Sequence, residues 1–138
     1  MVDADFSELA DALAAARDAV TCDQKRTPTV RATAVVLAFG RVYVRHASTH
    51  PERFLLAAAI PRPAPGPGEQ RVRQLADEMR AQLVETGAIH PSMFRDASWT
   101  IVPALYGLAS LAATGQLDDA HRDEGVRAVV QTVLRGLG

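Results

Sequence analysis

The chain has 138 residues and a net charge of −1, and its 15 basic residues are scattered rather than clustered. This length suits one domain, and the scattered charge argues against a basic surface for nucleic acid. A single cysteine, Cys22, excludes an intrachain disulfide and a thiolate metal cluster. The N-terminus lacks the positive region and apolar run of a signal peptide. We therefore expect one cytoplasmic domain over residues 1–138.

Two helices are predicted at the start of the chain. Asp5 and Glu8 form a capping-box pattern, and apolar residues recur every three or four positions over residues 6–20. After a polar connector, Thr27 is a typical helix cap and Pro28 suits the first helical position.

Residues 34–45 are ambiguous. They are rich in β-branched and aromatic side chains around Gly40 and Arg41, which is also the pattern of a hairpin with a two-residue turn. The rest of the chain offers no obvious partner strands, and an isolated hairpin is only marginally stable in water. We therefore predict that the second helix continues through this segment.

A proline-rich segment separates two helical blocks. Pro51 opens a short apolar helix, which ends where residues 61–68 supply four prolines and two glycines. This composition predicts a loop over residues 61–68. Residues 69–86 then show the spacing of an amphipathic helix, and Gly87 is a typical residue to close it.

Residues 97–117 contain no charged side chain, and about 20 uncharged residues is the length that spans a bilayer. However, several serines and threonines, Pro103 and Gly107 interrupt the stretch. A bilayer tolerates such residues only when they find partners. We therefore predict a helix that is buried on several faces and not a membrane span.

The remaining sequence signals predict where the last two helices of the bundle begin and end. Ser92 is the expected cap of the uncharged helix, and Gly115 is expected to end it. Asp118 and Asp119 favour a helix N-terminus, and residues 126–137 supply the apolar face of the last helix. The sequence thus predicts an all-α fold of about six helices.

The order of these segments resembles the C-terminal ligand-binding and dimerisation domain of tetracycline-repressor (TetR) type transcription regulators, in particular the tryptophan-histidine-glycine subgroup. The matching stretches are residues 31–43, 50–54, 87–89, 105–111 and 134–137. The chain opens at what resembles the helix that links the two domains of such regulators. We therefore expect the DNA-reading helix-turn-helix domain to be absent, and we expect no specific DNA binding without it.

The resemblance also implies a pocket for an apolar small-molecule effector. Large side chains on the helices that would enclose it are the candidate ligand-binding residues, although ordinary core packing would use the same residue types. Hydroxyl groups and an indole N–H among them could meet a ligand's polar groups. The candidates are Phe39, Tyr43, Met79, Met93, Phe94, Trp99 and Tyr106.

The last two helices carry more apolar surface than one small domain is expected to cover, and patches of that size usually mark an interface. We predict a homodimer that pairs through them. The predicted interface residues are Leu105, Leu108, Ala109, Leu111, Ala112, Val126, Val129, Val130 and Val133. Two functions stay open: a sensor of an apolar effector, or a helical dimerisation module without a ligand.

No catalytic residue, metal site or cofactor is predicted. His46 and His50 stand four residues apart, but two ligands are too few for a structural zinc site. The sequence contains no glycine-rich phosphate loop, no serine in a nucleophile elbow and no other group of catalytic residues. We therefore expect a protein that is not an enzyme.

Overall fold

The structure is a computed structural model that describes residues 2–138. In this range the chain forms six α-helices, one 3₁₀ turn and no strand, which confirms the all-α prediction. The elements are α1 (Val2–Thr21), α2 (Pro28–Thr49), α3 (Pro51–Ala59), α4 (Pro67–Glu85), η1 (Pro91–Met93), α5 (Phe94–Ala113) and α6 (Asp119–Leu137).

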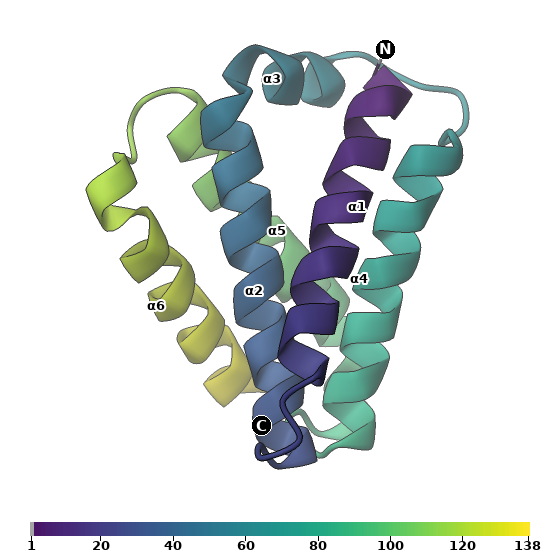
Figure 1. The fold of residues 1–138 in the computed structure, drawn as a ribbon, viewed down its shortest axis with the longest axis vertical. Helices are drawn as coiled ribbons and strands as arrows, with labels where there is room; N and C mark the ends of the chain where they lie inside the picture. Colours follow the sequence, from purple (N-terminus) through teal and green to yellow (C-terminus); the bar gives the residue numbers. More distant parts are fainter. Residues whose placement is uncertain (1) are drawn as a thin grey trace.

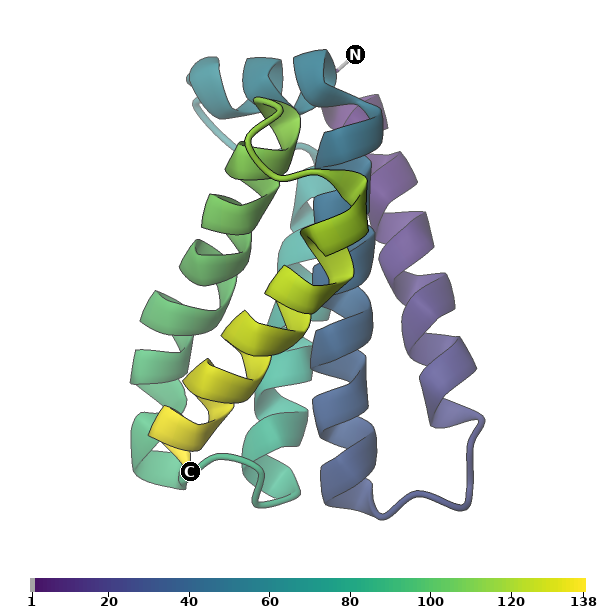
Figure 2. The same ribbon diagram turned by 90° about the vertical axis from the view of Figure 1, so that its left-hand side faces the viewer.

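Helix α2 lies at the centre of the bundle (Figures 1 and 2). It contacts α1 and α4 as well as α5 and α6, and α1 also packs along α4. The short helix α3 crosses the end of the bundle where α1 begins (Figure 1). The largest fully buried side chains come from α2, α4, α6 and the turn after α4 and are Val36, Val44, Leu83, Ile89 and Val126. The core is therefore built around α2.

The ambiguous segment 34–45 is helical, as predicted. Gly40 lies within the helix and forms no turn. A Cβ atom at this position would lie 2.7 Å from Cγ1 of Val126 and 3.0 Å from Cδ2 of Leu105. Gly40 therefore lets α5 and α6 approach α2 closely, and this contact compensates for the low helix propensity of glycine.

Helix α1 begins at Val2, before the predicted cap Asp5, so the capping-box prediction is wrong. Asp5 lies inside the helix, and its Oδ2 atom is 3.0 Å from Nε2 of His46 on α2. Its carboxylate thus makes a contact between two helices instead of a local cap.

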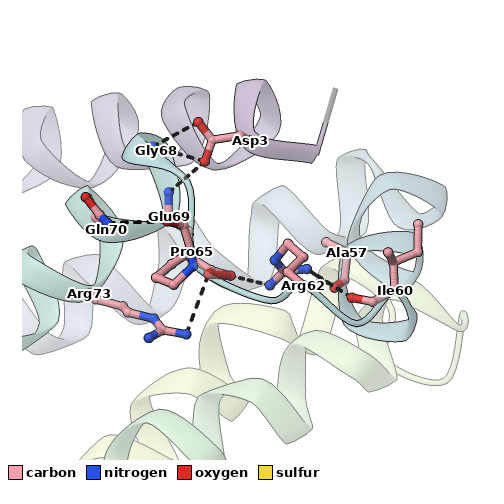
Figure 3. Close-up of polar contacts among 9 residues, drawn as sticks. All are labelled: Asp3, Ala57, Ile60, Arg62, Pro65, Gly68, Glu69, Gln70 and Arg73. Atoms are coloured by element: carbon pink, nitrogen blue, oxygen red, sulfur yellow. Dashed lines mark hydrogen bonds and ion pairs between the residues drawn. The ribbon is translucent and has the colours of Figure 1, made fainter.

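Helix α4 begins inside the predicted loop 61–68, because Pro67 and Gly68 form its first turn. Proline is tolerated there because the first N–H groups of a helix have no partner within the helix. The cap comes from α1: the Asp3 carboxylate accepts hydrogen bonds from the N–H groups of Gly68 at 3.0 Å and Glu69 at 3.2 Å (Figure 3). The sequence pattern missed this cap because it joins residues that are distant in the chain.

Other helix ends follow the sequence signals. The Thr27 side chain caps α2, and Gly87 and Gly115 have φ angles of 78° and 77°, which suit glycine after a helix end. The prediction for Ser92 is wrong. Ser92 lies inside η1, and its backbone N–H donates to Nδ1 of His90, which caps that turn.

Asp118 caps α6, as predicted from its position. Its Oδ1 atom accepts a hydrogen bond from the His121 backbone N–H at 3.0 Å and lies 2.7 Å from Nδ1 of the His121 ring. The hydrogen bond between the two side chains raises the pKa of His121 and lowers the pKa of Asp118. His121 is thus a capping residue at the surface.

The uncharged stretch 97–117 forms most of α5, which continues through Pro103 and ends before Gly115. Between residues 2 and 138, no helix has both the length and the apolar character that crossing a membrane requires.

Helix α2 already covers part of the predicted dimer surface. Five of the nine predicted interface residues are buried within one copy of the chain, namely Leu105, Ala109, Ala112, Val126 and Val130. These side chains pack in the core of one copy, and the interface assigned to them stays a prediction. The other four are partly buried or exposed, namely Leu108, Leu111, Val129 and Val133.

Candidate ligand-binding site

A cavity lies between α1, α2 and α4, at the end of the bundle opposite α3. We call it the main cavity, and its volume is about 380 Å³. Its floor is apolar, and its residues come from α2 and α4: Ala32, Val35, Phe39, Leu75 and Met79. A volume of this size lies within the range of small-molecule sites, which are mostly apolar.

The mouth of the main cavity is polar. Arg17 on α1 and Glu78 on α4 form an ion pair of 3.3 Å across it. Arg31 on α2 also lines the cavity, and its Nη2 atom donates a hydrogen bond of 2.9 Å to the carbonyl of Arg26. Thr86, at the end of α4, accepts a hydrogen bond of 2.6 Å from the side chain of Thr29. The site therefore combines an apolar interior with charged and polar groups at its entrance.

A smaller cavity of about 120 Å³ lies near α3 and is lined by an aromatic cluster. The ring of Phe54 packs edge-on against Tyr43 at 5.9 Å and lies 5.6 Å from the ring of Tyr106. Burial, and to a lesser degree the neighbouring Tyr106, raise the pKa of Tyr43, so its hydroxyl stays neutral. Phe54 was not among the residues predicted to bind a ligand, although it lies in one of the stretches that carry the family resemblance.

Polar residues also line this smaller cavity. Asp5 and His46 contact each other there, and Arg53 lies 3.7 Å from the Asp5 carboxylate. The rings of His46 and His50 are 5.3 Å apart. Within residues 2–138, no group of three or more histidine, cysteine or acidic side chains is arranged to hold a metal ion. His46 contacts Asp5 through its Nε2 atom and thereby joins α2 to α1.

The seven predicted ligand-binding residues do not share one site. Phe39 and Met79 line the main cavity, whereas Tyr43 and Tyr106 line the smaller one. The other three line neither cavity and are Met93, Phe94 and Trp99. In one copy of the domain the seven candidates are therefore divided between two cavities and other positions, and their role in ligand binding stays a prediction.

Trp99 belongs to an exposed apolar face on α5. Its side chain is 77% exposed, and Val102, Pro103 and Tyr106 follow at helical spacing and are also exposed. A Cβ atom at Gly107 would meet no other atom within 4 Å. We call these five residues the outer α5 face. It is the opposite side of the helix from the buried positions that contact α2.

The chain matches a family model described as "Tetracyclin repressor-like, C-terminal domain" over residues 36–137, about three quarters of its length. This chain belongs to the tetracyclin repressor-like C-terminal domain family. Comparisons with curated proteins and with solved structures give no match. In this tetracyclin repressor-like domain the matched range begins within α2 and ends with α6. Domains of this family are regulatory and not enzymatic.

Proposed function

We propose that this domain senses a small-molecule effector for a transcription regulator and that it binds the effector in the main cavity. The observation that carries the proposal is the apolar floor beneath a polar mouth, in a domain of a regulatory family. DNA binding then belongs to a separate helix-turn-helix domain. Because such a regulator acts on chromosomal DNA, the cytoplasm stays its predicted location.

The position of the cavity between α1 and α4 indicates how ligand binding would change the position of a DNA-reading domain. Helices α1 and α4 both line the cavity, and α1 resembles the helix that connects to the DNA-reading domain. At the far end of the pair, Asp3 of α1 caps the first turn of α4. An effector that binds more tightly to one spacing of α1 and α4 shifts the population toward it. A shift of α1 would then move an attached DNA-reading domain.

A thermal-shift screen tests the proposal. Because a ligand that binds only the native state raises its stability by mass action, at least one compound from a lipophilic library should raise the Tm. The variant Ala32→Leu, which fills the cavity floor, should lose this response. Ala15→Leu, at an exposed position of α1, should keep it. A library without a single hit, or hits that Ala32→Leu binds equally well, would contradict the proposed site.

We also propose that two copies of the domain pair through α5 and α6. The outer α5 face is apolar and uncharged, and it adjoins the predicted interface residues that stay partly exposed, namely Leu108, Leu111, Val129 and Val133. An apolar surface of this kind usually marks an interface. The open space beside Gly107 would let a second helix approach closely.

Val102→Asp should therefore convert a dimer to a monomer, because the charge would be buried without a partner in the interface. The matched control is Val30→Asp, since Val30 is 52% exposed and lies in the first turn of α2, where an acidic side chain is favourable. Analytical ultracentrifugation at tens of micromolar (~50 µM, where a micromolar Kd gives mostly dimer) measures the result. A wild-type monomer under these conditions would refute the dimer.

The second candidate function is a dimerisation module without a ligand. The outer α5 face favours it, because that face serves pairing whether or not the main cavity is occupied. The two candidates differ in the thermal-shift screen: a module without a ligand shows no compound-dependent rise in Tm, yet it still dimerises.

A further inference from the structure

Arg31, at the mouth of the main cavity, carries a charge that pairs with no acidic side chain of the described chain. Three charged residues line the cavity, namely Arg17, Arg31 and Glu78. Arg17 pairs with Glu78 at 3.3 Å and with Asp18 at 3.2 Å, so both of these carboxylates are engaged by Arg17. Over residues 2–138, no carboxylate oxygen lies within 4.0 Å of a nitrogen of Arg31, which therefore forms no ion pair.

Arg31 also has an unused hydrogen-bond donor. Its Nε atom is buried and has no partner within the described chain, while Nη2 donates to the carbonyl of Arg26. A buried donor without a partner is unfavourable, and a donor on a charged group more so. The planar guanidinium matches a carboxylate, which can accept two parallel hydrogen bonds from it. A ligand with a carboxylate would thus supply the ion-pair partner that Arg31 lacks.

The partial charges of the helix ends at this mouth offset the charge of Arg31 only in part. The N-terminus of α2 contributes about half a positive charge, and the C-termini of α1 and α4 contribute about half a negative charge each. The three ends together amount to about −0.5, which is smaller than the full charge of Arg31. The first turn of α2 contains no acidic side chain that would offset Arg31. The helix ends therefore do not neutralise the charge of Arg31.

The apolar floor extends from Arg31 along the same helix. Val35 and Phe39 follow Arg31 at one-turn spacing on α2, and Met79 faces them from α4. Eight residues of helix span about 12 Å. A ligand with its anionic group at Arg31 would lay an apolar body of about that length over Val35 and Phe39.

We propose that the main cavity takes an amphipathic organic anion, with a carboxylate bound by Arg31 and an apolar body between α2 and α4. The proposal rests on the proposed function, since it names the chemical class of the effector for the same cavity. It differs from the sequence-based expectation of a purely apolar effector.

Isothermal titration with matched probes tests this assignment. Biphenyl-4-carboxylate should bind the wild-type domain at least about tenfold more tightly than biphenyl-4-carboxamide, which has nearly the same shape and no charge. Arg31→Gln should remove most of this preference. Arg41→Gln is the matched control, because Arg41 lies on the same helix, is exposed and lines neither cavity; this variant should keep the preference.

Equal binding of the two probes, or a preference that survives in Arg31→Gln, would overturn the anionic assignment and leave the cavity as a site for neutral ligands. Binding of neither probe would overturn the assignment as well. The proposed function is tested by a different experiment. It is contradicted only if the thermal-shift screen gives no compound whose effect on the Tm is lost in Ala32→Leu. The melting temperature of Arg31→Gln, measured beside that of Arg41→Gln, shows whether the variant is folded.

Discussion

Replacing Arg62 with methionine should lower the free energy of unfolding by about 3 kcal/mol, because it leaves a buried carboxylate without its main partner. Glu69 is the one charged side chain that is buried in the described chain, at 6% exposure. The Arg62 guanidinium pairs with the Glu69 carboxylate and donates to the carbonyl of Ala57 at 2.7 Å (Figure 3). It also lies 5.0 Å from the ring of Phe6 on α1. Arg62 therefore joins the loop after α3 to both α1 and α4.

The size of the loss depends on which positive charge still lies near the Glu69 carboxylate after the substitution. Arg73 lies 3.5 Å from the Glu69 carboxylate but is largely exposed, so it compensates only in part. The double variant Arg62→Met, Glu69→Met should recover much of the loss, because no unpaired charge is then buried. Urea unfolding followed by circular dichroism measures all three proteins.

The matched control is Arg71→Met. Arg71 pairs with Asp11 at 2.8 Å between the same two helices, α1 and α4, but both side chains are exposed. An exposed pair contributes about 1 kcal/mol or less, so this substitution should change stability little. Equal effects of Arg62→Met and Arg71→Met would show that burial of Glu69 does not matter and would contradict the prediction.

The helices of this domain could be predicted from the sequence because most have a periodic apolar face and several have a clear end signal. Thr27, Gly87 and Asp118 mark three of these ends, and the structure confirms each of them. The cap of α4, which was not predicted, is a contact between distant segments. Asp3 caps α4 from α1, and no local pattern records such a contact.

The orientation of α5 could not be predicted, since the helix is apolar on nearly all sides. Leu105 and Tyr106 are neighbours in the chain, yet the first is 5% exposed and the second 43%. Without a polar face there is no contrast from which to read the buried side. Trp99 was expected in a pocket for the same reason and lies at the surface. The polar half of the candidate site was missed because Arg31 looks like an ordinary exposed residue in the sequence.

The contact that fixes α5 and α6 against α2 is at Gly40, and it leads to the second prediction. Gly40→Val should lower the free energy of unfolding by about 3 kcal/mol, because the new side chain has no space. Its Cβ atom alone would lie 2.7 Å from Val126, which is fully buried and cannot move aside freely. Gly40→Ala should have a smaller effect, since the helix propensity gained, about 1 kcal/mol, offsets part of the strain.

Gly136→Val is the matched control for this substitution. A Cβ atom at Gly136 would meet nothing within 4 Å, so the same change should stay within about 0.5 kcal/mol of the wild type. Gly40 lies where both C-terminal helices pack closely on α2, so its replacement should shift these helices and weaken the proposed dimer. Gly136→Val should leave the fold intact. Urea unfolding and sedimentation of the two variants measure these effects. A Gly40→Val protein as stable as Gly136→Val would mean that α5 and α6 do not pack on α2 at this distance.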